Sequence, residues 1–260
     1  MKRNWLIVLI VAVAGIVVAS CSKDNSDNVE KFYGEKPVKQ LTDRSTYTSV
    51  LTQFVYSYDN QGRVKSVIEK RDGEEVLEYK VTWGSKPEMT CYDLVANIVG
   101  NHWEAALFKG RVVSMIENYN STVAYTCHFE YNSQGKLTAF GGKADDITVK
   151  TVLVWEDGDL VRMEDALKPE DVLYMEYGNK INKIGAFPMI LATDIGITAV
   201  FYGGKGALTL KHLPEKVSYL NEQRTKWLSI LMEWELDKDG FPARVTLSQG
   251  DQYETIEFEY

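Results

Sequence analysis

The chain has 260 residues, of which 45% are hydrophobic and 12% aromatic, so it is long enough to bury a sizeable core in one large β domain or two smaller ones. Its charged residues (25%) are mixed in sign, and the formal net charge is −8. Phosphate contacts need grouped lysine or arginine side chains, and this acidic chain has no basic cluster. These features exclude a nucleic-acid-binding protein.

The N-terminus predicts a lipoprotein signal peptide over residues 1–20. Lys2 and Arg3 precede an apolar run of 14 residues, Trp5 to Val18, whereas a spanning helix needs roughly 20. The VASC sequence that ends at Cys21 resembles a bacterial lipobox, in which the cysteine thiol takes the lipid. An uncleaved anchor helix with an incidental cysteine is the alternative. Acyl chains on Cys21 would attach the protein to a membrane, at about 0.8 kcal/mol per buried CH₂.

Residues 21–39 are polar and predict a flexible tether. Ser22 follows the cysteine. By resemblance to known lipoprotein sorting, an aspartate at this position would favour retention in an inner membrane, so the serine argues against such retention. The Lys23–Asp27 run resembles the short charged export tags of Bacteroidota surface lipoproteins. We therefore expect a lipid-anchored protein of the outer membrane, exposed on the cell surface.

From Phe54 onward, apolar and polar residues alternate in short runs separated by turn residues. Phe54, Tyr56 and Tyr58 share one strand face, Asp59 to Gly62 supplies a turn, and Val64 to Ile68 returns as the second strand of a hairpin. The same pattern predicts hairpins with turns at residues 132–135, 156–159, 178–179 and 237–240. It also predicts further strands at 76–83 and at 107–116, the latter broken by Lys109-Gly110, and a last strand at 253–260.

A hairpin alone is marginally stable, so these strands must share a face. We predict an all-β domain over residues 40–260, an antiparallel meander of about a dozen strands curled into a barrel-like fold with its apolar face inward. One insert, Phe187 to Tyr202, is apolar nearly all round and predicts a short helix or irregular segment, with a further hairpin as the alternative. Residues 87–99 are a second candidate for a short helix.

Cys91 and Cys127 are a candidate disulfide, because paired cysteines oxidise in the cell envelope. Cys127 shares the strand parity of Tyr125 and Phe129, however, which places it on the apolar face. A buried free thiol is the alternative.

The sequence predicts no catalytic residues, no metal site and no cofactor. The turn at Asp237 to Gly240 begins like a calcium loop but lacks the downstream acidic ligands, and Asp157 to Asp159 likewise predicts an ordinary turn. The histidines His102, His128 and His212 show no zinc spacing and are expected to face solvent, which disfavours a Cys127–His nucleophile pair. The carboxylate pairs, including Glu233 with Glu235, are expected on a solvated outer face rather than in a glycosidase cleft.

Two aromatic features remain. Trp83, Trp103, Trp155, Trp227 and Trp234 could stack on sugar rings, but their alternation with polar residues favours core positions for most of them. The last strand ends in alternating aromatics, as in outer-membrane barrels. Glu254 shares the parity of Ile256 and Phe258, which favours a strand that closes a water-soluble barrel instead.

Three features resemble a Bacteroidota lipoprotein family of unknown function with a porin-like fold. They are the Tyr58-Asp59-x-x-Gly62-Arg63 type of turn, the apolar insert followed by Gly203-Gly204-Lys205 and Leu213-Pro214, and the closing stretch from Trp234 to Pro242. The turn also resembles tyrosine–aspartate hairpin repeats. The resemblance covers residues 40 to 260; it implies a barrel-like β fold and no established activity.

We predict a non-catalytic binding or interaction protein for a glycan, a peptide or another envelope component. A carrier that holds an apolar ligand such as a lipid inside the barrel is the first alternative. An envelope hydrolase is the second.

Overall fold

The computed structural model describes residues 36–45, 50–60, 62–108, 111–119, 122–144, 147–184, 209–220 and 225–260. The signal peptide, Cys21, most of the predicted tether and the predicted insert at 187–202 lie outside these residues. In the described part of the chain, no helix has the length and apolarity needed to cross a membrane.

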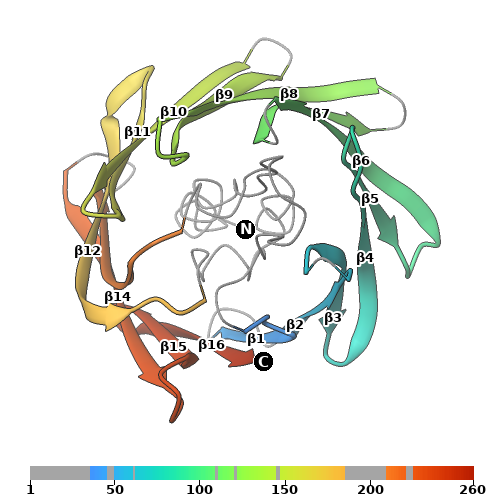
Figure 1. Ribbon diagram of the computed structural model, residues 1–260. Helices are drawn as coiled ribbons and strands as arrows, with labels where there is room; N and C mark the ends of the chain where they lie inside the picture. Colours follow the sequence, from blue (N-terminus) through green and yellow to red (C-terminus); the bar gives the residue numbers. More distant parts are fainter. Residues whose placement is uncertain are drawn as a thin grey trace.

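The described residues form a closed barrel of 16 antiparallel strands (Figure 1). Each strand pairs with the next along the chain, and β1 pairs with β16 to close the ring, so the predicted meander is confirmed with more strands than expected. The strands are β1 (Gln40–Ser45), β2 (Leu51–Tyr58), β3 (Val64–Arg71), β4 (Glu74–Thr82), β5 (Glu88–Asp93), β6 (Ile98–Phe108), β7 (Arg111–Tyr119), β8 (Thr122–Tyr131), β9 (Leu137–Ala144), β10 (Ile147–Glu156), β11 (Asp159–Asp165), β12 (Lys168–Ile181), β13 (His212–Leu220), β14 (Trp227–Leu236), β15 (Pro242–Gln249) and β16 (Gln252–Glu259).

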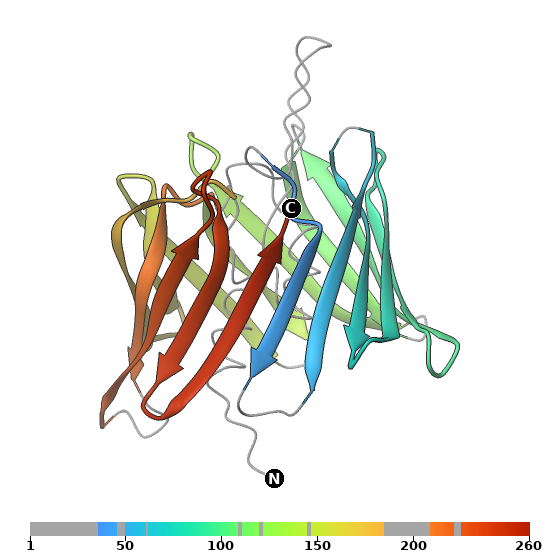
Figure 2. The same cartoon turned by 90° about the horizontal axis from the view of Figure 1, so that it is seen from below.

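The two ends of the barrel differ. At one end, which we call the latched end, the chain enters β1 and leaves β16, with the Lys39 amide donating to the Glu259 carbonyl (2.7 Å). Figure 2 shows β1 and β16 side by side, with the C-terminus at this end. The opposite end, the far end, carries the β3–β4, β5–β6, β11–β12 and β15–β16 turns.

Side-chain acceptors fix three turns of the latched end. Asp59 Oδ1 accepts from the Arg63 amide (2.9 Å), while the Asp59 amide donates to the Arg63 carbonyl (2.8 Å). Gly62 adopts φ 76°, a left-handed conformation that a side chain disfavours. Asn132 and Asp237 make the same pair of contacts in their turns. The Asp-x-x-Gly turn expected from the sequence is therefore present in structure.

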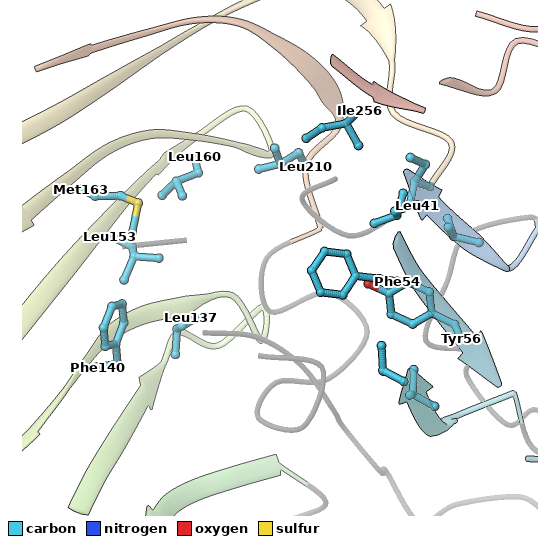
Figure 3. Close-up of a cluster of buried hydrophobic side chains, with 14 of the residues drawn as sticks. Leu41, Phe54, Tyr56, Leu137, Phe140, Leu153, Leu160, Met163, Leu210 and Ile256 are labelled. Carbon is cyan, nitrogen blue, oxygen red and sulfur yellow. The ribbon is translucent and has the colours of Figure 1, made fainter. Parts of the chain in front are cut away.

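The inner face of the wall is apolar. In most strands buried residues recur at alternate positions, as Ile230, Met232 and Trp234 do on β14 and Ile256 and Phe258 on β16. Figure 3 shows part of this surface, with Phe54 and Tyr56 on one side of the barrel and Phe140, Leu153 and Met163 on the other. The predicted inward orientation of the apolar face is confirmed.

The outer face is mainly polar and charged, with exposed apolar or aromatic side chains at some positions, such as Ile116 and Leu231. A row of cross-strand partners runs Glu235–Arg244–Glu257 over β14, β15 and β16, with Arg244 bonded to both carboxylates at 3.1 and 3.3 Å. Lys216 on β13 contacts Glu176 on β12 at 2.6 Å. Glu233 and Glu235 are exposed on this face, as predicted.

Three local predictions are wrong. The hairpin turn expected at residues 178–179 is absent, because β12 continues through these residues to Ile181, with register shifts against β13 on either side of Tyr177. Residues 87–99 form β5, a turn and the start of β6 rather than a helix, because Met89 and Cys91 are buried on the strand period of two. The strand expected at 107–116 is the end of β6 and the start of β7.

Candidate functional site

Most candidate aromatic residues have a structural role at the latched end. Trp234 Nε1 donates to the Pro214 carbonyl (2.6 Å), and Tyr177 Oη donates to the Leu160 carbonyl (2.7 Å). In each bond, a side chain at the end of an even-numbered strand donates to a backbone carbonyl at the start of the preceding odd-numbered strand. Among the described residues, seven side chains make this contact: Tyr58, Trp83, Tyr131, Trp155, Tyr177, Trp234 and Tyr260.

Polar side chains interrupt the apolar inner wall where the barrel closes. Asp43 on β1 and Glu254 on β16 share the parity of Leu41 and Ile256, which are buried, so their carboxyl groups lie on the inner face. The two carboxyl groups are close enough to influence each other's pKa. Two ionised carboxylates this close would repel each other, so the arrangement favours a pair that keeps a proton.

The same inner surface continues across β2 onto β3. Thr52 pairs in register with both Asp43 and Arg71. The Glu69 side chain is only 1% exposed, and a buried carboxylate needs a partner of opposite charge. The Arg71 guanidinium is that partner, with its Nε 2.6 Å from Glu69 Oε1. We call Asp43, Thr52, Glu69, Arg71 and Glu254 the seam site.

The carboxyl pair favours the protonated form. Burial, together with the nearby Glu254 charge, raises the pKa of Asp43 to about 8 from its ordinary value of 3.8. Burial also raises the pKa of Glu254, while the hydrogen bond from Asp43 opposes that shift. At neutral pH the pair can therefore both donate and accept hydrogen bonds at the inner wall.

The seam site lacks the geometry of a glycosidase. Such enzymes hold two carboxyl groups roughly 5 to 10 Å apart, with the scissile bond or a water between them. In the seam site the two carboxyl groups lie at neighbouring inward positions of the paired strands β1 and β16, close enough to raise the pKa of Asp43. The arrangement fits the recognition of a polar group better than acid–base cleavage of a glycosidic bond.

The histidine and cysteine candidates do not come together. Cys91 and Cys127 are both free and buried, on strands separated by β6 and β7. Burial raises the pKa of Cys127 to about 11, which disfavours the thiolate that a nucleophile needs. His128 lies on the outer face, pointing away from Cys127.

His212 differs from the expectation that it faces solvent. Its Nδ1 lies 2.7 Å from Asp159 Oδ2, and Asp159 Oδ1 accepts from the amides of Lys211 and His212 (2.8 Å each). Asp159, predicted to belong to an ordinary turn, is buried and fixes the start of β13 to β11. Lys136 Nζ donates to the Thr209 carbonyl beside this cluster, where burial lowers the pKa of Lys136.

The described residues hold no group of three or more histidine, cysteine, aspartate or glutamate side chains placed to bind a metal ion. At Asp237 the reason is visible, because Oδ1 accepts from the amides of Asp239 (2.9 Å) and Phe241 (2.8 Å). These backbone bonds lower the pKa of Asp237 and stabilise the turn.

Sequence reasoning missed the seam site, although one signal for it was present. Glu254 occupies an apolar parity in β16, and a charged residue on the buried face of a strand needs a partner. The partner, Asp43, lies 211 positions away in a strand that the alternation did not predict. Only closure of the barrel brings the two residues together.

A closed, single-layered antiparallel barrel with an apolar inner wall is the class of protein that these observations define. Neither the known protein-family profiles nor the curated protein sequences contain a match to this sequence. Among the solved structures of similar fold are two porin-like proteins from Bacteroides. A porin-like protein from Bacteroides uniformis is 15% identical with a TM-score of 0.64, and the match covers 86% of this chain and 98% of that chain. A porin-like protein from Bacteroides vulgatus is 13% identical with a TM-score of 0.54, over the same shares. The porin-like fold that the sequence resembled is thereby confirmed.

Proposed function

We propose that this chain is an outer-membrane lipoprotein, exposed on the cell surface, that binds a ligand without catalysing a reaction. Acyl chains on Cys21 attach it to the membrane, residues 22–39 act as a tether, and the barrel stands in water.

The polarity of the outer wall is the observation that carries this proposal. A membrane-spanning barrel presents an apolar band outward, and an arginine or lysine on the lipid face at mid-membrane costs about 2–4 kcal/mol. Here the Lys216–Glu176 pair lies on that face near the middle of β13 and β12, and the Glu235–Arg244–Glu257 row lies on the same face nearer the latched end. An external anchor is then needed for membrane attachment, and the lipobox-like sequence at Cys21 supplies a candidate.

Anchoring is tested by replacing one residue. We expect the full chain, produced in a Bacteroidota host, to incorporate labelled palmitate and to fractionate with outer membranes, and Cys21→Ala to lose both properties. Protease added to intact cells should degrade the wild-type barrel. A Cys21→Ala protein that stays in the outer-membrane fraction until detergent is added would overturn the water-facing barrel.

The apolar inner wall favours a second candidate function, a carrier of an apolar ligand. Buried side chains such as Phe54, Phe140 and Met163 line the interior, and the seam site would orient a polar head group. Native mass spectrometry of the purified protein tests this candidate. A co-purifying lipid that is lost from Phe54→Asp would support the carrier, and a ligand-free mass would refute it.

A further inference from the structure

One tryptophan in the described part of the chain stands apart from the others. Trp103 and Trp234 are buried in the inner wall, while Trp83 and Trp155 donate to backbone carbonyls at the latched end. Trp227 is 49% exposed. It pairs in register with Leu220, and the next pair, Leu228 with Tyr219, has Tyr219 buried inside, so Trp227 lies on the outer face.

A second aromatic ring lies beside it. Tyr174 on β12 is 40% exposed, and its ring centroid is 5.6 Å from that of Trp227 with a tilt of 50° between the planes. Tyr174 pairs with Ser218 on β13, and Ser218 pairs with Ser229 on β14, whose hydroxyl lies 3.0 Å from that of Ser218. Two half-exposed rings and two hydroxyl groups thus share one stretch of outer wall.

The edges of this surface are apolar on one strand and charged on the other. Leu231, 48% exposed, lies on β14 two positions beyond Ser229 and is the register partner of Lys216. Lys216 in turn forms its ion pair with Glu176. Rings beside hydroxyl, ammonium and carboxylate groups match a pyranose, which has apolar C–H faces and a polar rim of hydroxyls.

The surface also faces the right direction for an external ligand. Trp227 begins β14 at the far end of the barrel, whereas the chain enters at the latched end, where Lys36 pairs with Asp239 at 3.1 Å. A barrel tethered to a membrane through residues before Lys36 would present Trp227 away from that membrane. A lipid surface is therefore a poorer match than a soluble or cell-surface molecule.

We propose that Tyr174 and Trp227, with Ser218 and Ser229 between them, form an oligosaccharide-binding platform on the outer wall. This inference deepens the proposed binding function and rests on it. One sugar ring stacks on Trp227, and the next contacts the tilted Tyr174 ring. The serine hydroxyls and the Lys216–Glu176 pair bond to the hydroxyls at the ring edges.

The test is isothermal titration calorimetry on the full-length lipidated protein, purified in a detergent without a sugar head group. The probes are maltohexaose, cellohexaose, mannohexaose and xylohexaose. We expect at least one to bind, and Trp227→Ala and Tyr174→Ala each to weaken binding about tenfold or more, which is about 1.4 kcal/mol. Tyr253→Ala, which removes an exposed aromatic side chain of β16, is the matched control and should change Kd less than about twofold.

Several outcomes would overturn the platform. Equal binding by wild type and Trp227→Ala places the sugar elsewhere and leaves the binding function intact. No binding of any probe by the wild type refutes the platform, while palmitate labelling of Cys21 still reports separately on anchoring. A wild-type dimer that Trp227→Ala converts to a monomer, measured by analytical ultracentrifugation, would assign the surface to self-association. Far-ultraviolet circular dichroism confirms that each variant is folded.

Discussion

Replacing Asp43 with asparagine should make the barrel more stable at alkaline pH. In the wild type, Asp43 keeps its proton up to about pH 8, whereas an unfolded chain loses it near the ordinary value of 3.8. Between these two values the folded protein binds more protons than the unfolded chain, so its free energy of unfolding falls as pH rises. An asparagine amide can donate to Glu254 at every pH, which removes this dependence.

The size of the effect follows from the shift in the pKa of Asp43. A shift of about 4 units corresponds to about 6 kcal/mol, at 1.36 kcal/mol per unit, if one group carried all of it. The proton is shared with Glu254, and both side chains retain some contact with solvent, which screens the charge. We therefore expect the wild type to lose about 2–3 kcal/mol between pH 5 and pH 8.5, and Asp43→Asn to lose less than about 1 kcal/mol.

Urea unfolding followed by tryptophan fluorescence at pH 5, 6, 7 and 8.5 measures this difference. Asp251→Asn, in the exposed turn between β15 and β16, is the matched control because it removes an aspartate near the seam without touching the pair. It should follow the wild-type curve. Wild-type stability that is equal at pH 5 and pH 8.5, or that falls equally in Asp43→Asn, would refute a proton-sharing pair at the seam.

Three further predictions concern the barrel wall. Gly142→Ala should lower the free energy of unfolding, measured in urea, by about 3 kcal/mol or more, because an added Cβ would clash with the Thr126 carbonyl oxygen. Gly84→Ala is the control: a Cβ there meets nothing within 4 Å, so the free energy of unfolding should hardly change. Tyr177→Phe should destabilise the barrel by about 1–2 kcal/mol, because it removes the hydroxyl that donates to the Leu160 carbonyl. An unchanged urea midpoint would contradict a stabilising role for this hydrogen bond. Iodoacetamide added to unreduced, urea-unfolded Cys21→Ala protein should modify both Cys91 and Cys127, and a lack of modification at both would contradict free thiols. In the folded protein, Cys127 should stay unmodified at pH 8, since burial raises its pKa to about 11.

The sequence predicted the strands whose alternation is strong and missed those in which it is interrupted. Phe54, Tyr56 and Tyr58 carry a clear period of two, and β2 and β3 lie where expected. In β13, Pro214 lies opposite Tyr177, where the register shifts and the sheet tolerates a proline. In the sequence, a proline at this position indicates the end of a strand, so β13 was not predicted. In β1, the inward residue after Leu41 is Asp43, so the alternation of apolar residues ends after one member.

The candidate sites were harder to predict because they depend on partners that the sequence does not place. The aromatic residues at the ends of even strands were expected as core, but their bonds to carbonyls need the register of two strands. Trp227 and Trp234 lie seven positions apart on β14, so they take opposite faces, and one is exposed and the other buried. The sequence did not show that β14 extends back to Trp227, and the neighbours of Trp227 on β13 and β12 are set only when these strands pair.

Sidedness links the fold to the proposed function. A barrel wall is one strand thick, so each strand assigns its odd residues to one environment and its even residues to the other. In β14 the residues Ile230, Met232 and Trp234 face inward, while Glu233 and Glu235 face outward beside Arg244. A register slip of one residue would put the carboxylates inside and the tryptophan outside, so the charge row and the apolar wall fix each other. That pattern turns the charges of β14 and β15 toward the surroundings, which disfavours contact of this part of the wall with lipid. The argument for attachment therefore depends on Cys21, and the argument for recognition depends on the places where the pattern is broken, the seam site inside and the Tyr174–Trp227 platform outside.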